Sequence, residues 1–205
     1  YAFIGKNSND GSINYLIFGV WADQYFANIK TATDRIVTGS GADPGTVAVT
    51  YGSWRHVVLV LEHDGTNMDL SIYAPQHDSS APIFTSTNNT TGAVHNNLFL
   101  DAASLSSWFF GTELDGSSTK TDFVNGDLAE IGFFNAALDM NDANAIYNSG
   151  TPLDLEFDSG GYDKASNLQS YYRFDNNSLS SNVAKDEVGS SNGTVSGATA
   201  ANYVV

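Results

Sequence analysis

The sequence predicts an all-β protein, an antiparallel β-sandwich with one short α-helix near residues 139–148. Three observations support this prediction. Apolar and polar residues alternate with a period of two along much of the chain, the apolar segments are short, and turn-forming residues separate them. Many short strands joined by turns are typical of two stacked sheets, and they exclude a helical bundle.

The strand signals are apolar segments rich in β-branched and aromatic residues. The segment 57–61 is continuously apolar, which indicates a strand buried on both faces. Asp64-Gly65 follows it and predicts a hairpin turn, because this pair readily adopts positive φ. The expected strands, in chain order, are residues 15–21, 25–30, 47–51, 55–62, 68–73, 83–84, 98–100, 108–110, 128–134 and 168–174.

The one helix is predicted from its end signals. Asp139 can cap the N-terminus, and Asp142 places a carboxylate near the positive end of the helix dipole. Leu138 and Ala143 have the spacing of a hydrophobic staple. Gly150 is expected to end the turn after the helix.

The character of the chain changes after residue 150. Residues 151–168 are polar and Gly-rich, and the segment that follows residue 174 is rich in Ser, Asn and Gly. We therefore expect a sandwich domain over residues 1–150 and a C-terminal crossing and docking tail over residues 151–205.

The composition excludes several classes of function. Eight Lys and Arg against 23 Asp and Glu give 8 − 23 = −15, and a surface this acidic repels nucleic acid and anionic membranes. No apolar segment approaches the roughly 20 residues that span a bilayer, so membrane insertion is not expected. The chain has no Cys, which excludes disulfides, thiolate metal ligands and a Cys nucleophile.

Three segments between residues 54 and 150 resemble one family in the same order. They are residues 54–58 (WRHVV), residues 123–138 (FVNGDLAEIGFFNAAL) and residues 146–150 (IYNSG). These segments resemble the laminin-G-like, concanavalin A-like jelly-roll domains. The resemblance implies that the sandwich is a jelly roll, with the WRHVV segment in a strand. Apart from the resemblance, we expect Trp54 to pack in the core.

The C-terminal segments have a narrower resemblance. They are residues 151–155 (TPLDL), 158–162 (DSGGY), 168–174 (LQSYYRF) and 186–194 (DEVGSSNGT). They resemble the tails of such domains in structural proteins of tailed phages and marine viruses. The resemblance implies a virion component: a tail fibre, a baseplate accessory or a capsid decoration. Two departures are Tyr172, where relatives carry Trp, and Ala129, where many carry Asp.

The tail leaves two arrangements open. In many relatives a segment like residues 168–194 opens the jelly roll instead of ending it. The tail here either folds back onto its own domain or completes a neighbouring subunit by adding a strand to an exposed sheet edge. The expected partners are therefore copies of the same chain and other virion proteins.

The sequence does not predict an enzyme. Jelly-roll glucanases place carboxylates on alternate positions of one strand, so that two of them lie roughly 5 Å apart in one cleft. The nearest match is Glu156 and Asp158, which have no third carboxylate and lie in the Gly-rich crossing. We expect a solvated loop there.

Calcium is the one candidate cofactor. Asp154, Glu156 and Asp158 have the spacing of the first ligands in a calcium loop, but Ala165 stands where the bidentate Glu belongs. Asp175 and Asp186 flank Ser- and Asn-rich turns and are the candidate ligands that remain.

Aromatic side chains are the candidates for ligand binding. Trp21 and Tyr25 lie at a strand end beside polar residues, and Trp108 lies between Ser-rich and Gly-Thr segments. Core packing is the competing interpretation for each. An exposed ring would mark a glycan or protein contact.

These observations lead to a functional hypothesis and an alternative. The hypothesis is a non-enzymatic structural or adhesion module of a virion, which assembles through sheet edges and loops and contacts host surface glycans. The alternative is a carbohydrate-binding module of a secreted bacterial protein, located outside the cell.

Overall fold

The computed structural model describes most of the chain, and its residues fall into two compact units, 1–125 and 126–205. Each unit is described by itself. The expected strand at residues 98–100 lies outside the described residues. The described residues are 2–6, 15–30, 35–37, 47–63, 68–88, 108–115, 119–175, 179–180 and 182–196.

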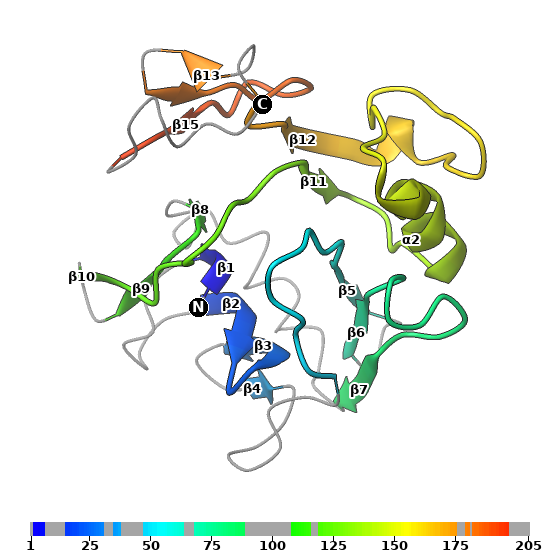
Figure 1. The fold of residues 1–205 in the computed structure, drawn as a ribbon, viewed down its shortest axis with the longest axis horizontal. Helices are drawn as coiled ribbons and strands as arrows, with labels where there is room; N and C mark the ends of the chain where they lie inside the picture. Colours follow the sequence, from blue (N-terminus) through cyan, green and yellow to red (C-terminus); the bar gives the residue numbers. More distant parts are fainter. Residues whose placement is uncertain are drawn as a thin grey trace. The chain divides into compact units, whose positions relative to one another are not determined.

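The larger sheet of the first unit contains five antiparallel strands in the order β4-β3-β2-β1-β8 (Figure 1). The turn between β2 and β3 pairs Trp21 with Gln24, and its two central residues, Ala22 and Asp23, have φ of 49° and 62°. Positive φ at both positions is the hairpin geometry that matches strand twist. The strands are β1 (Ala2–Lys6), β2 (Tyr15–Trp21), β3 (Gln24–Lys30), β4 (Arg35–Val37) and β8 (Trp108–Phe110).

The second sheet of this unit contains β5 (Val58–His63), β6 (Met68–Tyr73) and β7 (Phe84–Asn88) in sequential antiparallel order. Buried and half-buried residues alternate along β6, as expected for a strand with one face on the core. A short hairpin, β9 (Glu113–Asp115) with β10 (Thr119–Thr121), completes the unit.

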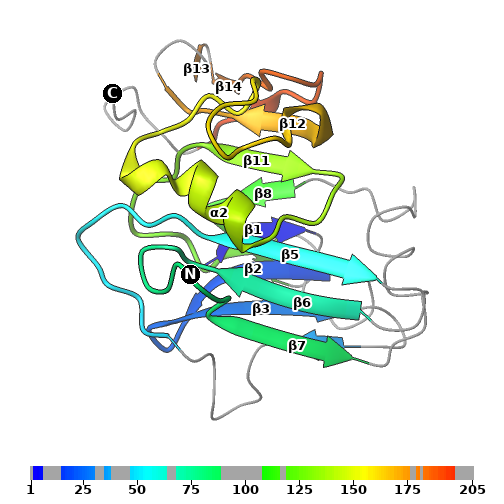
Figure 2. The same ribbon diagram turned by 90° about the vertical axis from the view of Figure 1, so that its right-hand side faces the viewer.

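The two larger sheets share one hydrophobic core. Figure 2 shows β5, β6 and β7 lying over β1, β2 and β3. Alternate residues of β2 and β3 face alternate residues of β6, which is how two sheets bury their inner surfaces. The fully buried members of this shared core are Leu16, Phe18, Ala27, Ile29, Met68, Leu70 and Ile72.

The apolar segment 57–61 is less buried than its sequence predicts. Val57, Leu59 and Leu61 are half-buried against the shared core, and Val60, on the other face of β5, is 8% exposed. Both faces are covered in part. The segment therefore contributes to the core without lying wholly inside it.

The second unit contains two small antiparallel sheets. β11 (Ile131–Phe134) pairs with β12 (Leu168–Tyr172), so this strand of the expected tail docks on its own chain. β13 (Leu179–Ser180), β14 (Val183–Ala184) and β15 (Gly193–Thr194) form the other sheet. The expected boundary at residue 150 falls inside this unit. Its core contains Leu155, Tyr162, Leu168 and Tyr171.

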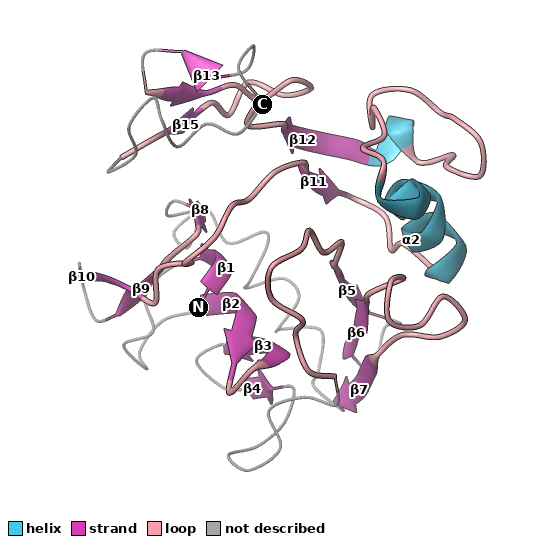
Figure 3. Ribbon diagram, in the orientation of Figure 1, coloured by secondary structure: helices cyan, strands magenta, loops and turns pink. Residues whose placement is uncertain are grey.

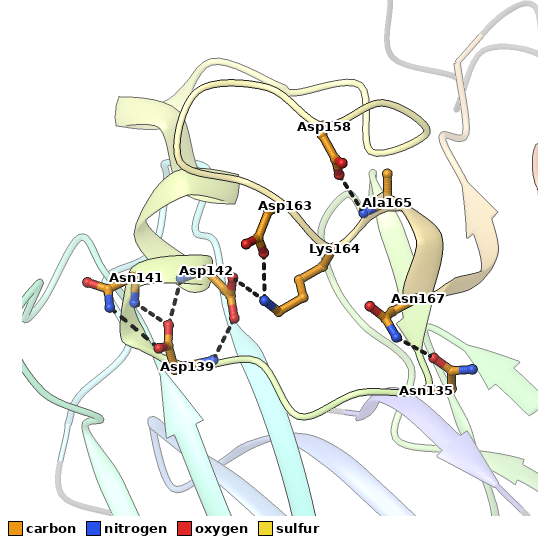
Figure 4. Close-up of polar contacts among 9 residues, drawn as sticks. All are labelled: Asn135, Asp139, Asn141, Asp142, Asp158, Asp163, Lys164, Ala165 and Asn167. Carbon is orange, nitrogen blue, oxygen red and sulfur yellow. Dashed lines mark hydrogen bonds and ion pairs between the residues drawn. The ribbon is translucent and has the colours of Figure 1, made fainter.

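The helix α2 (Met140–Tyr147) begins where the sequence predicts (Figure 3). The Asp139 carboxylate accepts the backbone N–H groups of Asn141 and Asp142, and the Asp142 carboxylate accepts that of Asp139 at 3.0 Å (Figure 4). This reciprocal pair is a capping box. The helix ends at Tyr147, close to the expected position, and Asn148 follows it with a φ of 43°. Gly150, with a φ of 85°, is the last residue of the 3₁₀ turn Asn148–Gly150, as expected for the residue that ends the turn.

The described residues form mainly antiparallel β-sheets with one short α-helix, which confirms the all-β prediction. Within those residues, no helix combines the length and the apolar character that crossing a bilayer requires.

Candidate functional site

Among the described residues of the first unit, four large aromatic side chains are exposed. Trp21 is 48% exposed, Tyr51 59%, Trp54 60% and Phe123 60%. Large rings usually bury most of their area, so several exposed rings in one unit indicate a binding surface. Phe123 follows β10, whereas Trp21 ends β2 and the other two rings precede β5. We call Trp21, Tyr51 and Trp54 the aromatic surface.

The β2–β3 turn holds two members of the aromatic surface together. Trp21 is the last residue of β2, and its ring lies 6.2 Å from that of Phe26. Two residues further on, the Asp23 carboxylate accepts the hydroxyl of Tyr51 at 2.8 Å. The Asp23 carbonyl also accepts the backbone N–H of Val49 at 2.7 Å. The segment that carries Tyr51 is therefore tied to the turn that follows Trp21.

Trp54 is a correction to the sequence analysis. The resemblance implied a strand at residues 54–58, and we expected Trp54 in the core, but β5 begins only at Val58 and Trp54 is exposed. Trp54 thus precedes the sheet and lacks the neighbouring strands that would cover its ring. The same loop contains Arg55, whose Nε donates to the carbonyl of Thr50 at 3.4 Å.

Tyr25 lies beneath polar side chains in the same unit. It is 2% exposed, and its ring meets that of His77 edge to face at 5.9 Å. Burial raises the pKa of Tyr25, opposed by the charge of Arg55 and the side chain of Gln76. Burial, and then the charge of Arg55, lowers the pKa of His77, and burial lowers the pKa of His56 to about 4. Both histidines are therefore neutral at physiological pH.

The structure separates the three predicted ligand-binding aromatics. Trp21 is exposed, Tyr25 is buried with Val20 and Ala74, and Trp108 is half-buried against the shared core in β8. Sequence reasoning missed Tyr51 as a binding candidate, because the alternation of Val47, Val49 and Tyr51 with small or polar residues is a strand signal. The structure has only an isolated bridge there, between Ala48 and Gln24, and leaves the Tyr51 ring exposed.

The two predicted calcium ligands have different surroundings. Asp186 is 3% exposed, and its Oδ1 accepts the backbone N–H groups of Tyr171 and Gly189, each at 3.0 Å. Its Oδ2 accepts that of Ser191 at 3.2 Å. Asp175 is half-buried, 3.6 Å from Arg173 Nε. Calcium prefers oxygen ligands, whereas these contacts are to nitrogen. Calcium at these residues remains a prediction.

Burial and hydrogen bonding act in opposite directions on Asp186. Burial raises the pKa of its carboxyl group, and the N–H donors from Tyr171, Gly189 and Ser191 lower it, with help from the Ser170 side chain. The donors prevail, and the pKa lies below its ordinary value. The charged carboxylate is therefore the form that orders this loop.

A second charged cluster surrounds Arg173. Its guanidinium group lies 3.8 Å from Glu130, 3.8 Å from Asp154 and 3.6 Å from Asp175. The hydroxyl of Tyr171, a fully buried residue, donates to Glu130. Burial raises the pKa of Glu130, opposed by that hydrogen bond and by the charge of Arg173. Glu130 precedes β11 and Arg173 follows β12, so this cluster joins the ends of the two strands.

The carboxylates of the Gly-rich crossing order their own turns. Asp154 Oδ1 accepts the backbone N–H of Glu156 at 3.1 Å, and Asp158 Oδ1 accepts that of Ala165 at 3.0 Å (Figure 4). Among the described residues, no group of three or more His, Asp or Glu side chains is arranged to hold a metal ion.

Comparisons with protein-family models, with curated proteins and with solved structures found no match. The laminin-G-like resemblance therefore depends on the sequence motifs alone.

Proposed function

We propose that this protein is a non-enzymatic structural and adhesion module of a virion, built on a laminin-G-like, concanavalin A-like jelly roll. Two features support the proposal. The first unit has two antiparallel sheets over one shared core. In the second unit, residues of the phage-like DEVGSSNGT motif form one structural element, in which the Asp186 carboxylate accepts the backbone N–H of Gly189.

The observation that carries the adhesion function is the aromatic surface. The face of an exposed ring packs against the apolar side of a pyranose, and neighbouring polar groups bond the sugar hydroxyls. Trp21 and Trp54 provide exposed indoles. Tyr51 has its hydroxyl bound to Asp23, which holds its ring in one orientation. The proposed ligand is a glycan of a host cell surface.

The proposed contact requires no bond cleavage. Glycoside hydrolysis needs two carboxyl groups on either side of one glycosidic bond. The carboxylate placed at the aromatic surface is Asp23, and it accepts the hydroxyl of Tyr51. Stacking and hydrogen bonding are the chemistry that these side chains offer.

A carbohydrate-binding module of a secreted bacterial protein is the second candidate, because the aromatic surface fits it equally well. The two candidates differ in their partners. A virion module assembles with copies of itself and with other virion proteins, whereas a secreted module acts as one part of an extracellular protein. Cross-linking within purified native particles, followed by identification of the neighbours, separates them.

A glycan array probed with the intact chain tests the adhesion function. On the glycans that the unsubstituted chain binds, we expect Trp21→Ala and Trp54→Ala each to reduce retention about tenfold. The reason is that a buried aromatic contact contributes on the order of 1–2 kcal/mol. Phe157→Ala is the matched control, because Phe157 is 67% exposed in the second unit.

Two results would count against the adhesion function. If the chain binds no glycan on the array, with or without a calcium chelator, the adhesion function loses its support. An equal loss of binding in the Phe157→Ala control would show that the aromatic surface has no special role. Loss of binding with chelator alone would instead support the calcium prediction.

A further inference from the structure

The chain contains two Asn-Gly dipeptides, Asn125-Gly126 and Asn192-Gly193. In this dipeptide the backbone nitrogen of the glycine can attack the asparagine side-chain carbonyl carbon, because the glycine has no Cβ to obstruct the approach. The attack needs an accessible side chain and a backbone that can rotate into the reactive geometry. The structure gives the two dipeptides opposite surroundings.

Asn125-Gly126 lies in an exposed bend between elements. Both residues are exposed and belong to neither a helix nor a strand, and Asp127 is exposed as well. The residue immediately before Asn125, Val124, donates its backbone N–H to the carbonyl oxygen of Gly111 at 2.8 Å. Asn125 is the last residue of the first compact unit and Gly126 the first of the second. The backbone here is therefore not restrained by strand pairing.

Asn192 is exposed and Gly193 is half-buried, and hydrogen bonds restrain both. The Asn192 side-chain oxygen accepts the backbone N–H of Asp186 at 2.9 Å, which fixes the amide group. Gly193 pairs with Ala184 in the β14–β15 ladder, and the next backbone bond joins Val195 to Asn182 at 2.8 Å. Rotation toward the reactive geometry would break these bonds.

From this contrast we propose that Asn125 is a site of spontaneous deamidation in the folded protein, and that Asn192 is protected. The Gly126 nitrogen loses its proton and bonds to Cγ of Asn125, the Cγ–Nδ2 bond breaks, and ammonia leaves. Water then opens the resulting succinimide at either carbonyl and yields aspartate or isoaspartate. Overall, one nitrogen leaves and one oxygen enters.

The modification has two physical consequences. It adds one negative charge to a chain whose net charge is −15. In the isoaspartate product, the main chain runs through the former side-chain carbon and is one methylene longer. That extra link falls at the junction of the two compact units.

Peptide mapping by mass spectrometry tests the proposal on the full chain, incubated folded at mildly alkaline pH. We expect the peptide that contains Asn125 to gain one mass unit and to separate into two products, while the Asn192 peptide stays unchanged. In denaturant, where neither site is restrained, both peptides should convert at similar rates. Only the isoaspartate product should accept a methyl group from an isoaspartyl methyltransferase.

Gly126→Ala provides a second arm, because Gly126 is exposed and is not among the glycines with positive φ. This variant should slow conversion of Asn125 by at least tenfold in both folded and denatured chains. Folded-state conversion of Asn192 at the rate of Asn125 would overturn the proposal. Conversion of Asn125 in denaturant, with none in the folded chain over the same period, would overturn it as well.

Discussion

At the scale of single residues, Asp186 connects three segments of the second unit. Its carboxylate accepts backbone N–H groups of Tyr171 in β12, of Val188 and Gly189 in its own loop, and of Ser191 beyond it. We expect Asp186→Asn to lower the free energy of unfolding at neutral pH by about 2 kcal/mol. The reason is that the side-chain NH₂ of asparagine would face backbone N–H groups that the carboxylate oxygens accept. Urea denaturation measures the change, with the exposed Asp163→Asn as control.

The same substitution makes a prediction about pH. The pKa of Asp186 is lower in the folded chain than in the unfolded chain, so its contribution is present above the unfolded pKa of about 4 and is lost as pH falls through the folded value. The difference in stability between the unsubstituted chain and Asp186→Asn should therefore shrink on acidification below about pH 4. A difference that does not depend on pH would show that the carboxylate charge is not what orders the loop.

Packing explains why a glycine stands three residues after Asp186 in the segment 186–194 (DEVGSSNGT). A Cβ at Gly189 would lie 2.5 Å from Asp186 Oδ2 and 2.9 Å from the backbone oxygen of Gln169. Because backbone atoms cannot yield as a flexible side chain does, we expect Gly189→Ala to destabilise the fold by about 2 kcal/mol. Thermal unfolding compares it with Gly161→Ala, whose Cβ would make an ordinary 3.5 Å contact with Ala145. Equal melting temperatures would contradict the steric argument.

The candidate site could be predicted from the sequence only in part. Trp21 follows an apolar segment and precedes polar residues, so the sequence could predict that it lies at a strand end. The sequence could not predict the exposure of Tyr51 and Trp54, because that exposure depends on where β5 begins, and β5 begins at Val58. Tyr25 misled for the opposite reason: its neighbours in the sequence are polar, but the residues that cover it come from a distant loop, as His77 shows.

At the scale of elements, the helix α2 depends on its capping box. Asp139 supplies the side-chain acceptor for two N–H groups, and these bonds lower the pKa of its carboxyl group, the bond from Asp142 most of all. We expect Asp139→Ala to cost about 1 kcal/mol of stability. Asp139→Asn keeps an acceptor oxygen and should cost much less. The two variants, compared by thermal unfolding at neutral pH, should differ; equal losses would mean that the cap does not stabilise the helix.

The elements that the sequence predicted best contain several large apolar residues. β2, β6 and β8 have the bounds that the pattern indicated, because each contributes apolar residues to the first unit's interior. The two-residue strands β13 and β15 were not predicted, because two residues show no period and few of these are large and apolar. Both pair with β14, and no local pattern encodes such pairing.

At the scale of the whole molecule, net charge governs how copies of the chain can meet. At neutral pH each copy carries a formal charge of −15, and two such surfaces repel at long range. Salt screens this repulsion, whereas apolar and backbone contacts between sheet edges persist in salt. Assembly of the proposed virion module through edges and loops should therefore be opposed by charge and promoted by screening.

We accordingly expect self-association of the purified chain to strengthen as ionic strength rises at constant neutral pH, and also as pH approaches the isoelectric point near 4.2. Sedimentation velocity measures the mean mass across a salt series. The isoelectric arm needs a control for unfolding, because acidification protonates carboxylates that stabilise the fold. The circular dichroism spectrum must therefore stay unchanged for the mass to be interpreted. If copies instead associate through complementary charged patches, rising salt will dissociate them. A mean mass that falls as salt rises would contradict assembly through sheet edges and loops. It would not bear on the proposal that the aromatic surface binds a ligand.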